Sequence, residues 1–155
     1  MHLEYEHAAA SGLRRYVNVV AEELGCSGEA YYANLDPPPA YAYLALDDRL
    51  GEHPGQDTAL VWNEHDGWAV AIEATAGHDL SVVRYFGGEL LPSPSAVARF
   101  VGEVFAVRAP EAEPVGTTDG AKVRQLLAAY AIPYQERGAS RPGQPVQQTR
   151  RRPAR

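Results

Sequence analysis

The sequence has very little cysteine. Cys26 is the only one in 155 residues, which excludes a disulfide within one chain and a zinc site built from cysteines. Such sparing use of cysteine is typical of a reducing compartment, so we expect a cytoplasmic protein. No apolar run is long enough to cross a bilayer, and residues 1–11 include acidic side chains and no long apolar core. We therefore expect neither a membrane segment nor a signal peptide.

Lysine is equally scarce, because Lys122 is the only one and arginine supplies nearly all the positive charge. Residues 135–155 contain six arginines and one glutamate, a net charge of +5. Since the whole chain has a net charge of −6, residues 1–134 have a net charge of −11. The sequence thus predicts an acidic body with a basic tail, and the tail, poor in apolar residues, is predicted to be disordered.

Recognisable catalytic patterns are missing. The chain contains no GxSxG, no HExxH and no phosphate-binding loop in the required context. His65 and His78 lie in predicted turns at opposite ends of one strand and are not expected to meet, so we predict no metal and no cofactor. Cys26 follows a predicted helix, whose C-terminal dipole disfavours a thiolate. The sequence therefore favours a protein without catalytic activity, although an undetected enzyme or ligand-binding cleft near His65, His78 or the tyrosines stays an alternative.

What the sequence does contain is a hairpin over residues 58–75. Two apolar runs flank a polar insert that ends in Asp66-Gly67, a pair that supplies the positive φ of a tight reversal. Both tryptophans lie beside this turn. A hairpin alone is marginal in water, so its apolar face must be covered by other elements.

Further strands and three helices are predicted around the hairpin. Apolar residues recur every three or four positions in the first helix, and Ser93-Pro94 is a typical start for the second. The expected helices are 8–24, one that begins at Ser93-Pro94, and 119–131, and the expected further strands are 30–35, 41–47 and 80–86. Short connections favour antiparallel pairing. We predict an α+β fold, an antiparallel sheet of about four to five strands with helices on one face, in the order helix, strands, helix, helix, as a single domain over residues 1–134.

The aromatic residues fall mainly on the predicted strands. Because side chains alternate across a sheet, some of them must point away from the helices. They could border the core with their hydroxyls in water, or form an exposed face that binds a partner protein or a second copy. The candidate contact residues are Tyr41, Tyr43, Trp62, Trp68 and Tyr85. A protein-binding or accessory module is the predicted function.

The basic tail suggests an alternative function. Arg150, Arg151, Arg152 and Arg155 could bind nucleic acid, because each neutralised phosphate adds salt-dependent affinity. The acidic body would repel the same polyanion, so a nucleic-acid-associated regulator ranks below the protein-binding module.

The sequence also resembles an actinobacterial family of small proteins of unknown function. The similar segments are Tyr16-Val17 to Leu24-Gly25, Leu60 to Trp68, and Leu91-Pro92-Ser93-Pro94 with Val97-Ala98. The resemblance covers residues 10–108 and leaves out the helix at 119–131 and the tail. It implies no catalytic residues.

Overall fold

The structure is a computed structural model that describes residues 2–26, 31–74 and 79–131, with side chains from residue 7 onward. In chain order its elements are α1 (His2–Leu24), β1 (Tyr31–Asn34), β2 (Tyr41–Leu46), β3 (Thr58–Asn63), β4 (Gly67–Glu73), β5 (Leu80–Tyr85), α2 (Pro94–Phe105) and α3 (Gly120–Ala131). The predicted basic tail lies outside the described residues.

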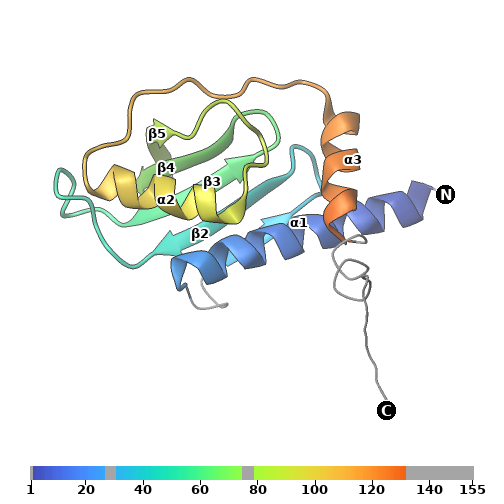
Figure 1. Cartoon of the computed structure of the whole chain (residues 1–155), viewed down its shortest axis with the longest axis horizontal. Coiled ribbons are helices and arrows are strands. Elements are labelled where there is room, and N and C mark those ends of the chain that lie inside the picture. Colours follow the sequence, from blue (N-terminus) through green and yellow to red (C-terminus); the bar gives the residue numbers. More distant parts are fainter. Residues whose placement is uncertain (1, 27–30, 75–78, 132–155) are drawn as a thin grey trace, which may run out of the picture. The chain divides into compact units, whose positions relative to one another are not determined.

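The five strands form one antiparallel sheet in the order β1-β2-β3-β4-β5, so that each strand pairs with the next along the chain. Figure 1 shows α2 and the C-terminal half of α1 on the same side of this sheet. The α+β class, the antiparallel sheet and the order of helix, strands and two helices are thus confirmed. This meander follows from short connections, which join antiparallel neighbours readily but cannot span a parallel crossover.

The predicted hairpin is formed by β3 and β4, with Glu64, His65 and Asp66 in its turn. The Asn63 side-chain oxygen accepts hydrogen bonds from the backbone N–H groups of His65 and Asp66, both at 2.8 Å. Gly67 ends the turn with φ +79°, a conformation that L side chains rarely adopt. The turn chemistry therefore fixes the register that places Trp62 opposite Trp68.

Both tryptophans lie on the side of the sheet that α1 covers, and both are fully buried. The Trp68 indole donates to the Tyr16 hydroxyl at 3.0 Å, and that hydroxyl donates to the Pro92 carbonyl at 2.5 Å. The Trp62 indole donates to the Leu90 carbonyl at 2.8 Å. Each indole N–H is therefore satisfied inside the core, where an unpaired donor would cost about 1–3 kcal/mol.

The second helix begins where the sequence predicts. The Ser93 hydroxyl caps α2 by accepting from the Ala96 N–H at 3.2 Å, and Pro94 stands in the first turn. Four apolar residues at helical spacing are buried toward the sheet, namely Val97, Phe100, Val101 and Val104. The Phe100 ring meets the Phe86 ring edge-on, with centroids 5.3 Å apart. Burial of this apolar stripe is what holds α2 on the sheet.

The chain divides into two compact units. One contains the sheet and α2 and comprises residues 16–120; the other, among the described residues, comprises 2–15 and 121–131. In this second unit Gly12 of α1 packs against α3, because a β-carbon at Gly12 would lie 1.7 Å from the Leu127 carbonyl oxygen. The helix α1 begins earlier than the predicted residue 8, and Gly12 is an interior contact residue of it.

Candidate functional site on the open face of the sheet

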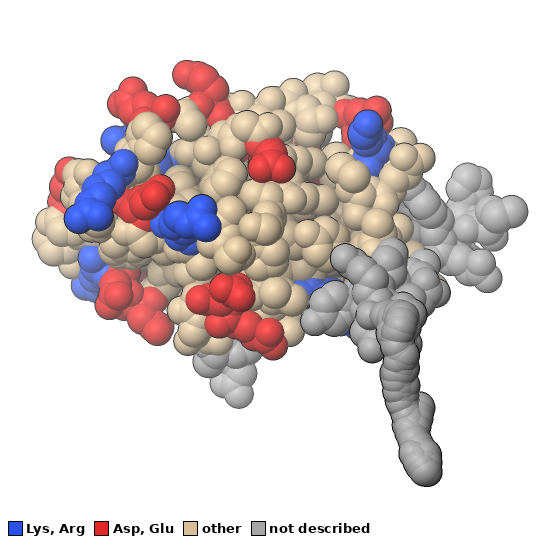
Figure 2. Space-filling model, in the orientation of Figure 1, with Lys and Arg blue, Asp and Glu red and all other residues tan. Residues whose placement is uncertain are grey.

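One face of the sheet is opposite α2 and is here called the open face. Alternation along the strands and the observed register assign its residues. From β1 to β5 they are Tyr32, Asn34, Tyr41, Tyr43, Ala45, Ala59, Val61, Asn63, Ala69, Ala71, Glu73, Leu80, Val82 and Tyr85. Glu73 is the only charged residue among these strand positions. On the side that bears α2, by contrast, basic and acidic side chains are interspersed (Figure 2).

Three tyrosines of β1 and β2 form a cluster on the open face. Tyr32 stacks on Tyr43, with ring centroids 5.3 Å apart and planes inclined by 14°. Tyr32 also meets Tyr41 edge-on at a centroid distance of 5.7 Å. The Asn34 amide donates to the Tyr41 hydroxyl at 3.1 Å. Tyr32, Tyr41 and Tyr43, called the tyrosine cluster below, hold one another in place through these contacts, each ring pair contributing about 0.5–1.5 kcal/mol.

The cluster is tied across the sheet to Glu73. The Tyr43 hydroxyl donates a hydrogen bond to Oε2 of this carboxylate, which belongs to β4. Since β3 lies between β2 and β4, the Tyr43 ring must cross β3, where Ala59 offers the room. Ala59 is fully buried although it lies on the open face. The small Ala59 side chain thus leaves room for the Tyr43 ring to lie over β3.

The electrostatics of the cluster are negative. Burial raises the pKa of the Tyr43 hydroxyl far above its ordinary value of 10.0, and the hydrogen bond to Glu73 with the charges of Glu73 and Asp57 raises it further. Burial also raises the pKa of Tyr32, with smaller contributions from Tyr41 and Glu73. Both hydroxyls therefore stay protonated at neutral pH, and the negative charge at the cluster belongs to the carboxylates.

The structure separates the predicted contact residues. Tyr41 and Tyr43 belong to the tyrosine cluster, and Tyr85 lies half-buried on β5 of the same open face. Trp62 and Trp68 point to the opposite side and have no exposed surface, so they cannot touch a partner. Tyr32, which the predicted set omits, is half exposed at 50% and is the outermost ring of the cluster. Tyr32 belongs to the tyrosine cluster because the β1–β2 register places it opposite Tyr43.

His65 is a structural residue. Its backbone carbonyl accepts from the N–H groups of Gly116 and Thr117 at 2.7 and 2.9 Å. Its ring nitrogen Nδ1 lies 2.9 Å from the Thr117 carbonyl. The hairpin turn therefore anchors the segment between α2 and α3. His78 lies outside the described residues.

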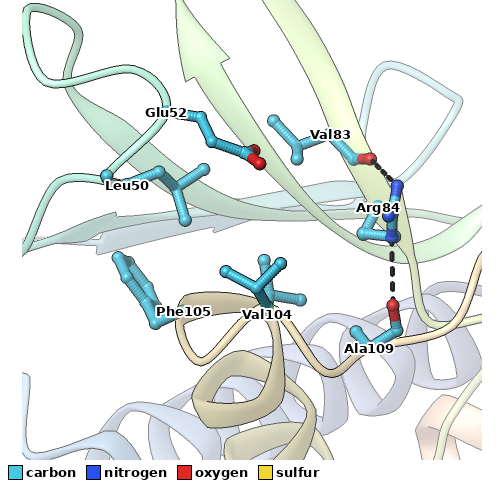
Figure 3. Close-up of a pocket in the computed structure, with 9 residues that line it drawn as sticks. Leu50, Glu52, Val83, Arg84, Val104, Phe105 and Ala109 are labelled. Atoms are coloured by element: carbon cyan, nitrogen blue, oxygen red, sulfur yellow. Dashed lines mark hydrogen bonds between the residues drawn. The ribbon is translucent and has the colours of Figure 1, made fainter.

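A cavity of about 180 Å³ lies between β5, the loop before β3 and the end of α2. Leu50, Val104 and Phe105 form its apolar wall, and Glu52 points toward it (Figure 3). The Arg84 guanidinium at its edge donates to the carbonyls of Ala109 at 3.2 Å and Val83 at 3.1 Å. The cavity is smaller than the roughly 300–1,000 Å³ of usual small-molecule sites. The Arg84 guanidinium at its edge already donates to two backbone carbonyls.

A second cavity, of about 380 Å³, lies between the end of α1, the end of β2 and α2. Cys26 and Asp47 are among its lining residues. Burial, followed by the charge of Asp47, raises the pKa of the Cys26 thiol. The thiol is therefore protonated at neutral pH, which is the opposite of what a nucleophilic cysteine needs.

No cluster of three or more histidine, cysteine, aspartate or glutamate side chains within the described part of the chain has the arrangement of a metal site. The same part contains no helix both long and apolar enough to span a membrane.

Comparison with known proteins places the chain in a family. The model of a family of unknown function, DUF6292, matches residues 16–103. The chain belongs to this family. No curated protein and no solved structure matches it.

The DUF6292 match includes all five strands and most of α2, and hence the whole open face. It begins at residue 16, where the larger compact unit also begins. Residues 1–15 and α3 lie outside the match. The predicted resemblance to a family of unknown function is confirmed, and its actinobacterial origin stays a prediction.

Proposed function

We propose that this DUF6292 protein is a non-enzymatic binding module that contacts a partner protein through the open face of its sheet. The observation that supports this function is the distribution of exposed apolar side chains. The large hydrophobic residues that the described part exposes are Tyr32, Tyr41, Leu80, Val82, Val107 and Leu126. The first four all lie on the open face. Two of them lie on β1 and β2 and two on β5, and large apolar groups exposed on one face of a sheet are typical of a binding surface.

The edges of the sheet are less suited to binding than the open face. At one edge, β5 contains an irregularity opposite Val70 and Ala71, and such bulges disrupt the ladder that an added strand needs. At the other edge, β1 has only 4 residues. Contact through the face is therefore favoured over addition of a strand from the partner.

The size of the open face sets the expected strength of binding. Five strands at about 4.8 Å spacing and about six residues at 3.3 Å each give roughly 24 by 20 Å, or about 500 Å². Standard protein interfaces bury about 800 Å² on each partner. An interface below this size is typical of a transient complex.

The test is site-specific photo-crosslinking in the cells that produce the protein. A photoreactive phenylalanine derivative replaces Tyr41 on the open face, and in a matched variant it replaces Arg99, which is exposed on α2. The proposal expects a discrete protein adduct from position 41 and none from position 99. Absence of any adduct at 41, or the same adducts from both positions, would refute it.

A further inference from the structure

The tyrosine cluster lies beside a carboxylate on the open face. Glu73, which the Tyr43 hydroxyl contacts, is the only charged residue among the described strand positions of that face. At the same end of the sheet Asp47 follows β2 and Asp57 precedes β3. The nearby cation Arg49 is paired with Asp57 at 2.8 Å. No lysine or arginine occupies a described strand position on the open face.

Two groups at the tyrosine cluster are available to a ligand, the ring of Tyr32 and the carboxylate of Glu73. The Tyr32 ring is 50% exposed and backed by the Tyr43 ring, with which it stacks. Of the two Glu73 carboxylate oxygens, Oε2 accepts from Tyr43, and Oε1 has no hydrogen bond to a described residue. An exposed aromatic ring beside a carboxylate matches a planar cation, which stacks on the ring and donates to the oxygen.

We infer that the partner segment that docks on the tyrosine cluster is cationic, and that it places an arginine side chain against Tyr32 with its guanidinium toward Glu73. This inference rests on the proposed function and names the chemistry of its partner. Arginine is favoured over lysine because its guanidinium is planar, stacks on aromatic rings and loses less hydration than an ammonium group.

Overall charge also favours a basic partner over a second copy. The whole chain has a net charge of −6, so two copies would repel each other as they approach. Face-to-face contact of two copies would also enclose the Glu73 carboxylates without a cation, and buried unpaired charges are costly. A basic segment is instead attracted, with an association rate that falls as salt increases.

The experiment is calorimetric titration of the full chain with a short blocked peptide in which arginine alternates with proline. Proline keeps the peptide extended, as in other aromatic-lined docking sites. A second peptide has glutamine at every arginine position. We expect binding of the arginine peptide that weakens with salt, and no binding of the glutamine peptide.

Variants then locate the contact. Tyr32→Ala and Glu73→Gln should each weaken binding by about two- to fivefold, the contribution of one exposed cation–π or charge contact. Tyr32→Phe should retain binding, because the ring and not the hydroxyl makes the contact. Glu103→Gln on α2 is the control and should bind like the unmodified chain.

Equal binding of both peptides, or no effect of Tyr32→Ala and Glu73→Gln, would overturn the inference. Failure of both peptides to bind, while position 41 still crosslinks a protein, would also overturn it but leave the proposed function intact. A crosslink from position 41 to a second copy of the chain would likewise overturn the inference and leave binding through the open face intact. If position 41 gives no adduct, or the same adducts as position 99, the proposed function itself is rejected.

Discussion

Val107, which follows α2, has a backbone conformation that valine rarely adopts, with φ 56°. Its N–H donates to the Val104 carbonyl at 3.1 Å, and the Arg108 N–H donates to the Glu103 carbonyl at 2.7 Å. Helices that end with this pair of hydrogen bonds usually have glycine at the position that Val107 occupies here. A left-handed conformation costs an L residue about 1–2 kcal/mol.

We therefore predict that Val107→Gly stabilises the protein by about 1 kcal/mol. Little burial is lost, because Val107 is 75% exposed. The measurement is the free energy of unfolding in urea. The control is Ala106→Gly, one residue earlier with φ −84°, which should bring no gain. If Val107→Gly lowers stability, strain at this position is not the dominant factor.

Tyr43 links stability to alkaline pH. Its hydroxyl has a pKa raised above the ordinary value of 10.0, chiefly by burial and then by Glu73. The folded state thus holds this proton more tightly than the unfolded state does. The resulting stabilisation is complete below pH 10 and is lost as the pH rises above it.

We predict that the unfolding free energy of the unmodified chain falls more steeply above pH 10 than that of Tyr43→Phe. Denaturant titrations at several alkaline pH values measure this slope, and tyrosinate absorbance reports the ionisation directly. Identical slopes in the two proteins would show that Tyr43 titrates normally.

At the scale of the elements, the packing of α1 against α3 depends on one glycine. A β-carbon at Gly12 would lie 1.7 Å from the carbonyl oxygen of Leu127 and 2.6 Å from its carbonyl carbon. Both atoms belong to backbone, which cannot rotate away as a side chain can. The contact therefore requires glycine in the interior of a helix, where it is otherwise unfavourable by about 0.5–1 kcal/mol.

We predict that Gly12→Ala destabilises the chain by about 1–3 kcal/mol, as overpacking does, and speeds amide hydrogen exchange in α3. Gly102→Ala is the matched control. It lies in α2 with nothing within 4 Å of the added β-carbon, so it should gain about 0.5–1 kcal/mol from helix propensity. Faster exchange in α3 in the control as well, or a stabilised Gly12→Ala, would contradict the packing argument.

In the whole molecule, the two faces of the sheet have different surroundings. Leu60 and Val61 are neighbours on β3 that point to opposite sides. Leu60 is fully buried in the core on the side of α2, whereas Val61 is half-buried on the open face. The same polar substitution at the two positions thus measures which side of the sheet is covered.

We predict that Leu60→Glu destabilises the protein by more than about 3 kcal/mol, because it buries an unpaired charge. Val61→Glu should change stability by less than about 1 kcal/mol, the range of strand propensity effects. Circular dichroism and urea denaturation of both variants check this. Equal damage at the two positions would mean that the open face is covered.

Much of the fold could be predicted because its signals are local. Asp66-Gly67 specifies a turn, and the serine and proline at 93 and 94 specify a helix start, whatever the rest of the chain does. The start of α1 could not be predicted from its own residues. Gly12 lowers helix propensity locally, and its use as a contact for α3 is visible only in three dimensions.

The candidate site was only partly predictable for the same reason. Alternation places Trp62 and Trp68 on the same face as Leu60 and Val70, but it does not say which face the helices cover. The predicted contact set therefore combined buried tryptophans with open-face tyrosines. Tyr32 belongs to the tyrosine cluster because the β1–β2 register places it opposite Tyr43. The loop between these strands is rich in proline, and its sequence does not specify the register.

The sequence by itself determined the elements, their order along the chain and the antiparallel pairing, because turns, caps and apolar periodicity act over a few residues. The tertiary structure decided which sheet face α2 and the C-terminal half of α1 cover, and that Tyr43 reaches across β3 to Glu73. The physical reason is that burial and cross-strand contacts depend on residues far apart in the chain, which no local pattern contains.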